Sequence, residues 1–157
     1  MNTTPKTVDV LLVEDSDDDA EMTMDTLEEY QLGDRAVRVR DGQEALDFMF
    51  LQGAYRDRRS GLPKLILMDI KMPKVDGLEV LRALRADPRT AGVPIVLLTS
   101  SAEERDIYRA HDLNATSYIV KPVDYERFVE AIREIGTYWL VLNQLNAAPT
   151  SAGTAEL

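Results

Sequence analysis

The sequence predicts an α/β domain in which five parallel strands alternate with helices. Short and nearly continuous apolar runs recur along the chain, as in strands that are buried on both faces of a sheet. Segments with helical periodicity separate these runs, and capping or turn residues mark the boundaries. The 157 residues suffice for one domain with a substantial core and are too few for two domains of ordinary size.

Five segments are predicted to be strands. Residues 8–13 are almost entirely apolar, whereas residues 36–40 alternate in the manner of an edge strand. The other strands are predicted at residues 64–69, 95–99 and 117–120. Right-handed crossovers leave few arrangements of such units, and we expect a doubly wound parallel sheet with strand order 2-1-3-4-5.

Helices are predicted after each strand. The expected N-caps are Ser16, Asp41, Ser101 and Asp124. Glu104 lies three residues after the third of these caps, which predicts a capping box. Gly33 is expected to end the first helix. The first, second, third and fifth helices are predicted to end near residues 30, 52, 86 and 143, and residues 53–63 to form a polar loop.

Composition excludes several classes of function. The chain has no Cys and a single His, His111, which excludes thiolate and multi-histidine metal sites. The net charge is −10, and residues 14–34 hold ten acids and no base, so we expect neither nucleic acid nor an anionic membrane as a partner. No apolar run approaches the roughly 20 residues of a membrane helix, and the first residues lack a secretory signal, so a cytoplasmic location is expected.

Chemically distinctive side chains follow four of the predicted strands. Glu14 and Asp15 follow the first strand, Asp69 ends the third, Thr99 ends the fourth, and Lys121 follows the fifth. Because the carboxyl ends of parallel strands meet at one edge of the sheet, these groups should converge at the switch point of the fold.

Three clustered carboxylates repel one another unless a cation joins them. Oxygen ligands alone favour a hard ion, Mg2+ or Mn2+, over zinc. The three acids together with Mg2+ and Lys121 form a nearly neutral site, which could accept a phosphoryl group. An ionised carboxylate such as Asp69 can take that group covalently without a general base.

Four motifs resemble the receiver domain of two-component response regulators. They are LLVEDS at residues 11–16, LMDIKMPKVDG at 67–77, LTS at 98–100 and YIVKP at 118–122. The resemblance implies a flavodoxin-like (βα)5 fold. It covers residues 7–143 as a receiver domain and leaves residues 144–157 as a flexible tail.

The resemblance also implies the chemistry. A sensor histidine kinase would phosphorylate Asp69 in the presence of Mg2+, for which Mn2+ could substitute. The implied metal ligands are Glu14, Asp15, Asp69 and the backbone carbonyl of Lys71. The implied role is that of a switch that phosphorylates and dephosphorylates itself, and not that of a turnover enzyme.

The same resemblance implies how the switch works. Lys121 would pair with the phosphoryl group, and its peptide bond to Pro122 would be cis. Thr99 would close on the phosphoryl oxygens, and Tyr118 would rotate inward behind it. The response would reach the face built by the fourth helix, the fifth strand and the fifth helix.

Finer features resemble the stand-alone regulators that are paired with bacterial phytochromes. These features are the arginine-bearing loop before the third strand, the Leu-Thr-Ser-Ser run at residues 98–101 and a long last helix. They imply a bacterial phytochrome as the kinase, and a homodimer through the face named above and the last helix. The last helix carries two apolar stripes, of which a helix on a sheet needs one. The first comprises Phe128, Ile132, Ile135, Trp139 and Leu142, and the second comprises Tyr138, Val141 and Leu145.

Two other functions remain open at this point. One is a receiver-like docking module that never becomes phosphorylated, against which the presence of Asp69, Lys121 and Thr99 argues. The other is an Mg2+-dependent phosphatase with an aspartyl-phosphate intermediate. Such enzymes commonly carry a second Asp two residues after the nucleophile, and here that position is Lys71.

Overall fold

The structure is a computed structural model, and it describes residues 8–111 and 114–135 of the chain. Five parallel strands form one sheet in the order β2-β1-β3-β4-β5, which confirms the predicted doubly wound topology. The strands are β1 (Val10–Val13), β2 (Ala36–Val39), β3 (Leu65–Asp69), β4 (Ile95–Thr99) and β5 (Ser117–Val120).

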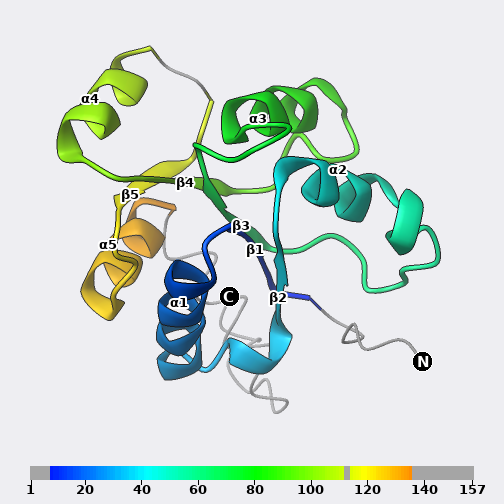
Figure 1. The fold of residues 1–157 in the computed structure, drawn as a ribbon, viewed down its shortest axis with the longest axis horizontal. Helices are drawn as coiled ribbons and strands as arrows, with labels where there is room; N and C mark the ends of the chain where they lie inside the picture. Colours follow the sequence, from blue (N-terminus) through cyan, green and yellow to red (C-terminus); the bar gives the residue numbers. More distant parts are fainter. Residues whose placement is uncertain (1–7, 112–113, 136–157) are drawn as a thin grey trace, which may run out of the picture.

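Helices cover both faces of the sheet (Figure 1). They are α1 (Asp17–Glu29), α2 (Gly42–Phe50), α3 (Gly77–Ala86), α4 (Ala102–Ala110) and α5 (Tyr125–Ile135). Helices α1 and α5 pack on one face, and α2, α3 and α4 lie on the other. Two short 3₁₀ helices, η1 (Gly33–Arg35) and η2 (Gly53–Tyr55), follow α1 and α2. Within the described segments, no helix is both long enough and apolar enough to cross a membrane.

Alternation along the strands divides the core into two clusters. In β1, Val10 and Leu12 point toward α1 and α5, whereas Leu11 and Val13 point toward α2 and α3. All four side chains are fully buried, as expected for an apolar run in a sheet that is covered on both faces.

Strand register brings the functional side chains to one edge. Val13 pairs with Met68, so the residues that follow β1 lie beside the end of β3. Thr99 pairs with Val120, and the backbone N–H of Lys121 donates to the carbonyl of Thr99 at 2.8 Å. The carboxyl ends of β1, β3, β4 and β5 therefore converge, as the sequence predicts.

Helix α1 ends close to the predicted residue 30, but Gly33 does not stop it. The helix ends at Glu29, and Gln31 takes the left-handed conformation with φ 65°. The backbone N–H of Leu32 donates to the carbonyl of Leu27 at 2.7 Å, so a Schellman motif closes the helix. Leu27 and Leu32 are both fully buried, and this apolar contact explains why the chain turns before the glycine, which begins η1.

The predicted end of α2 differs from the structure, and the predicted end of α5 lies outside the described residues. Helix α2 ends at Phe50 rather than near Gln52, because Leu51 has the left-handed φ of 57°. Helix α5 is described to Ile135, so its predicted extension to residue 143, both domain boundaries at 7 and 143, and the 144–157 tail lie outside the described residues.

The apolar stripes of the last helix are described only in part. Phe128 and Ile132 are fully buried against the sheet, and Ile135 is partly buried. The other members of both stripes, Tyr138, Trp139, Val141, Leu142 and Leu145, lie outside the described residues. The Lys121–Pro122 peptide bond is cis, as the resemblance implies.

Candidate functional site

Three carboxylates meet where β1 and β3 end. Glu14 and Asp15 directly follow β1, and Asp69 is the last residue of β3. Each offers an oxygen atom, and the three atoms lie within 4.8 Å of one another. Glu14 is fully buried, Asp69 is 8% exposed, and Asp15 faces solvent. The cluster thus has a buried floor and an open side.

Lys121 lies among these carboxylates. Its Nζ is 2.9 Å from Glu14 Oε1, 3.1 Å from Asp69 Oδ2 and 3.0 Å from Asp19 Oδ2. Burial works against the ammonium, but the hydrogen bonds to the three carboxylates outweigh it and raise the pKa of Lys121. The ammonium is therefore a permanent positive charge in the cluster.

Asp19 was not predicted as a site residue. It lies in the first turn of α1, where the helix dipole favours an acidic side chain. Its backbone N–H donates to the side chain of the N-cap Ser16 at 3.2 Å, which fixes that turn beside Lys121. Its position in the first turn of the helix that follows β1 could have indicated a site residue. The sequence, however, does not distinguish Asp19 from its acidic neighbours in that turn.

The environment of Glu14 favours the protonated form. Burial, and secondarily the charge of Asp69, raise the pKa of Glu14 from 4.5 to about 7, although Lys121 and the backbone N–H of Ser16 oppose the shift. A buried carboxyl of this kind is readily ionised when a divalent cation binds it. The donor set is oxygen only, so the residues present fit a hard divalent ion. The backbone carbonyl of Lys71, two residues after Asp69, stays a predicted ligand.

An arginine from the edge strand holds the backbone of this site. The Arg38 guanidinium donates to the Glu14 carbonyl oxygen from Nε at 3.0 Å and from Nη2 at 2.7 Å. Its Nη1 is also 2.8 Å from Asp17 Oδ1, to which Arg40 donates as well. From the sequence, Arg38 is predicted only as part of an edge strand, because no sequence pattern indicates a contact with a backbone carbonyl.

Thr99 and Lys71 both contact Glu104 of α4. The Thr99 hydroxyl donates to Glu104 Oε1 at 2.8 Å, and Lys71 Nζ lies 2.7 Å from Glu104 Oε2. Lys71, and to a smaller degree Thr99, lower the pKa of Glu104. The predicted capping box of α4 is wrong in one half. Ser101 accepts from the Glu104 backbone N–H at 3.1 Å, but the Glu104 carboxylate turns toward Thr99 and Lys71 instead.

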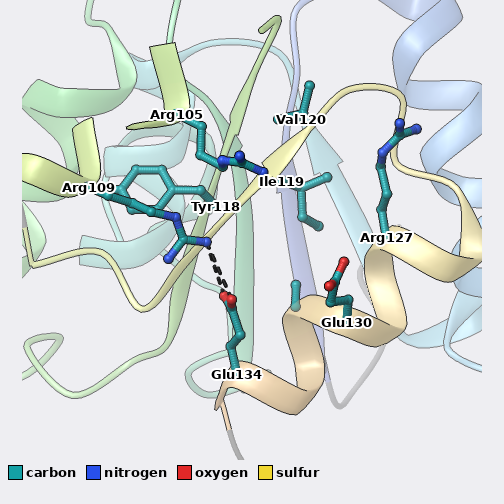
Figure 2. Close-up of a pocket in the computed structure, with 9 residues that line it drawn as sticks. Arg105, Arg109, Tyr118, Ile119, Val120, Arg127, Glu130 and Glu134 are labelled. Atoms are coloured by element: carbon teal, nitrogen blue, oxygen red, sulfur yellow. Dashed lines mark hydrogen bonds and ion pairs between the residues drawn. The ribbon is translucent and has the colours of Figure 1, made fainter. Parts of the chain in front are cut away.

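Tyr118 lies inside the face formed by α4, β5 and α5. It is 8% exposed, and its hydroxyl donates to the carbonyl of Tyr108 at 3.2 Å. Figure 2 shows the pocket beside it, with arginines from α4 on one side and charged residues of α5 on the other. The pocket has a volume of about 110 Å³, and an ion pair between Arg109 and Glu134 at 3.3 Å crosses it. His111, at the end of α4, is exposed.

Comparison with known proteins identifies the arrangement. The family model of the response regulator receiver domain matches residues 10–133. Rcp1, a response regulator of Synechocystis sp., is 33% identical over 139 residues, which cover 88% of this chain and 93% of Rcp1.

Solved structures agree with this match. The bacteriophytochrome response regulator AtBRR superposes with a TM-score of 0.78 and 43% identity, covering 84% of this chain and 94% of AtBRR. The phosphorylated cyanobacterial phytochrome response regulator RcpA gives a TM-score of 0.68 at 33% identity, with coverage of 85% and 94%. The Mn(2+)-bound form of Rcp1 gives 0.66 at 33% identity, with coverage of 83% and 93%.

Proposed function

This chain belongs to the response regulator receiver family of two-component signalling, and on that premise we propose that it is a switch phosphorylated on Asp69. One observation carries the proposal. The Asp69 carboxylate lies 3.1 Å from the Lys121 ammonium, and one of its oxygens lies within 4.8 Å of oxygens of Glu14 and Asp15. Covalent phosphorylation needs an acceptor next to cationic groups, and this site offers one.

The proposed reaction transfers a phosphoryl group from a histidine of a sensor kinase. An oxygen of the ionised Asp69 carboxylate attacks phosphorus, a P–O bond forms, and the P–N bond breaks with its electron pair returning to the imidazole. Glu14, Asp15, Asp69 and the Lys71 carbonyl would hold Mg2+, or Mn2+ in its place. When bound, this ion would offset the negative charge of the phosphoryl oxygens. The Mn2+-bound relative Rcp1 and the phosphorylated relative RcpA support this assignment.

Modification changes the charge at residue 69 from −1 to about −2. Lys121 is already 3.1 Å from the Asp69 carboxylate and is suited to pair with the added charge. In the proposed response Thr99 donates to a phosphoryl oxygen. Tyr118, for which an inward rotation is expected, is already buried in this structure, at 8% exposure, and would keep that position behind Thr99. The change then reaches the α4-β5-α5 face through the strands on which these residues lie.

Resetting the switch requires hydrolysis. Water attacks the phosphorus, inorganic phosphate leaves, and the Asp69 carboxylate is regenerated. We propose a self-resetting switch and not a turnover enzyme, because the position two residues after Asp69 holds Lys71, which is ion-paired with Glu104. No observation favours a docking module without phosphorylation over this proposal.

The proposed partners are a sensor histidine kinase and a second copy of this chain. The similarity to the bacteriophytochrome response regulator AtBRR and to the cyanobacterial phytochrome response regulator RcpA supports a bacterial phytochrome as the proposed kinase. The proposed place of action is the cytoplasm. The α4-β5-α5 face is the proposed dimer surface, together with the last helix. All nine residues of α4 are at least partly exposed, and Ile107 exposes 51% of its surface.

Transfer from a phosphorylated histidine kinase tests the function. Wild type should gain label in an Mg2+-dependent manner, and Asp69→Asn should gain none while it keeps its fold. Asp18→Asn, which removes an exposed carboxylate from the nearby first turn of α1, should be labelled like wild type. Labelling that persists in Asp69→Asn would refute the assignment of the acceptor.

A further inference from the structure

Glu104 joins three parts of the molecule around the proposed phosphoryl site. Its backbone belongs to the first turn of α4, one carboxylate oxygen accepts from Thr99 at the end of β4, and the other pairs with Lys71 in the turn after β3. The two distances, 2.8 and 2.7 Å, are those of strong charge-assisted contacts. Helix α4 is thus tied to the site by one side chain.

The Thr99 hydroxyl has one proton, which it can donate to one strong acceptor at a time. In this structure the acceptor is Glu104 Oε1. In the proposed phosphorylated state the acceptor would be a phosphoryl oxygen on Asp69. Thr99 is 2% exposed, so bulk water has little access to replace the contact that is given up. Movement of Thr99 toward Asp69 therefore requires release from Glu104.

Release has a direct consequence for α4. Helix α4 packs loosely, since all of its residues keep some exposure to solvent. Its first turn is held by the Ser101 cap and by the Glu104 carboxylate. Without the Thr99 contact, one of these two attachments is weakened, and the first turn gains freedom to move.

We propose that Glu104 is a positioning residue that holds Thr99 away from the phosphoryl site in the resting protein and transmits the release of Thr99 to α4. This inference rests on the proposed function and adds a coupling element to it. A carboxylate in α4 competes with the phosphoryl group for a single hydroxyl proton. The resting and active arrangements of Thr99 are then mutually exclusive, as a two-state switch requires.

Glu104→Ala is the direct test, with Glu103→Ala as the matched control. Both substitutions remove one negative charge from the same turn, but Glu103 is exposed and is not in the Thr99 contact. With acetyl phosphate and saturating Mg2+, Glu104→Ala should be phosphorylated about 3- to 10-fold faster than Glu103→Ala, because one hydrogen bond no longer favours the resting state. Glu104→Gln retains an oxygen acceptor for Thr99 and should fall between the two.

A double-mutant cycle separates positioning from a general structural effect. In a Thr99→Val background no hydroxyl is available, so Glu104→Ala should give no further acceleration. An acceleration that persists in that background, or equal rates for Glu104→Ala and Glu103→Ala, would overturn the inference while the proposed function stands.

Hydrogen exchange in the unphosphorylated protein tests the contact between Thr99 and Glu104 of α4 independently of phosphorylation. Backbone amides of residues 102–106 should exchange faster in Glu104→Ala and in Thr99→Val, and at the wild-type rate in Glu103→Ala. Unchanged exchange in the first two variants contradicts the tie between Thr99 and α4. Failure of wild type itself to accept phosphate would instead refute the proposed function.

Discussion

The Lys121 ammonium lies 3.1 Å from the Asp69 carboxylate, at the edge where β3 and β5 end. Two further carboxylates, those of Glu14 and Asp19, lie within 3.0 Å of the same nitrogen. Lys121 thus neutralises a cluster that would otherwise be strongly repulsive. Because Lys121 directly follows β5, it links the phosphoryl acceptor Asp69 to the α4-β5-α5 face.

Removal of this ammonium should destabilise the metal-free protein. Lys121→Met leaves the carboxylates of Glu14, Asp19 and Asp69 without their shared cation, and the loss should be about 1–3 kcal/mol at neutral pH. Lys74→Met, which removes an exposed lysine, is the control. Urea unfolding with and without Mg2+ measures both effects. Mg2+ should stabilise Lys121→Met more than wild type, and equal loss in the two variants would contradict this role.

Glu14 should make both stability and metal affinity depend on pH. Its pKa is about 7 in the folded chain against 4.5 for the free group, so the folded state binds more protons between these values. The free energy of unfolding of the metal-free protein should therefore fall as pH rises through this window, by on the order of 1–3 kcal/mol. Affinity for Mg2+ should rise over the same window, because the ion requires the ionised form.

Glu14→Gln provides the reference for this prediction. The difference in unfolding free energy between wild type and the variant, measured in chelator across the window, isolates the titration of Glu14 from that of other groups. Calorimetric titration with Mg2+ should show release of a proton from wild type near neutral pH. A wild-type profile parallel to that of Glu14→Gln would show that Glu14 does not titrate there.

Arg38 should support metal binding although it is not a ligand. Its two hydrogen bonds to the Glu14 carbonyl orient the turn that carries Glu14 and Asp15. Arg38→Leu should weaken Mg2+ affinity about 10-fold, as is typical when a group that orients ligands is removed. Arg40→Leu breaks a contact to the same Asp17 but leaves the Glu14 carbonyl bound, so its affinity should stay near that of wild type. Equal affinities in the two variants would refute this role for Arg38.

Gly77 is required by a close backbone approach. A Cβ atom at this position would lie 2.4 Å from the Asp69 carbonyl oxygen and 2.9 Å from the Ile70 Cα atom. Gly77→Ala should therefore destabilise the protein by about 1–3 kcal/mol and slow phosphorylation, although alanine favours helices. At Gly92 a Cβ atom would meet nothing within 4 Å, so Gly92→Ala should be close to neutral. Thermal unfolding and the rate of phosphorylation would show whether the two substitutions differ.

The dimer surface can be tested on described residues. Ile107→Asp places a charge on the exposed face of α4 and should shift the protein toward monomer in sedimentation experiments. Met22→Asp, at a similarly exposed apolar position on α1, should leave the association unchanged. An unchanged mass for Ile107→Asp would exclude this part of α4 from the interface.

The strands and the gathering of the site were predictable because they depend on simple patterns. Residues 95–98, for example, are all apolar, and the strand predicted at 95–99 has the bounds that the structure shows. If the strands are parallel, their carboxyl ends lie at one edge of the sheet, so Glu14, Asp69 and Lys121 must lie together at that edge. The backbone alone sets where the strands end, so side-chain conformation does not matter here.

Contacts that depend on side-chain direction were not predictable. Glu104 has the spacing of a capping box, but its carboxylate finds stronger partners in Thr99 and Lys71. Arg58 lies in the predicted polar loop yet is buried, because its guanidinium donates to the Phe48 carbonyl at the end of α2 and lies 4.1 Å over the Phe48 ring. Such partners are distant in sequence, or are backbone atoms that every residue shares.

Phosphorylation of Asp69 can be tested directly by the mass of the peptide that carries this residue. The protein would be treated with acetyl phosphate in Mg2+ and, separately, in excess chelator. Asp69 should gain one phosphoryl group in Mg2+ and none in chelator. Modification at another residue, or an unmodified Asp69 in the presence of Mg2+, would contradict this prediction.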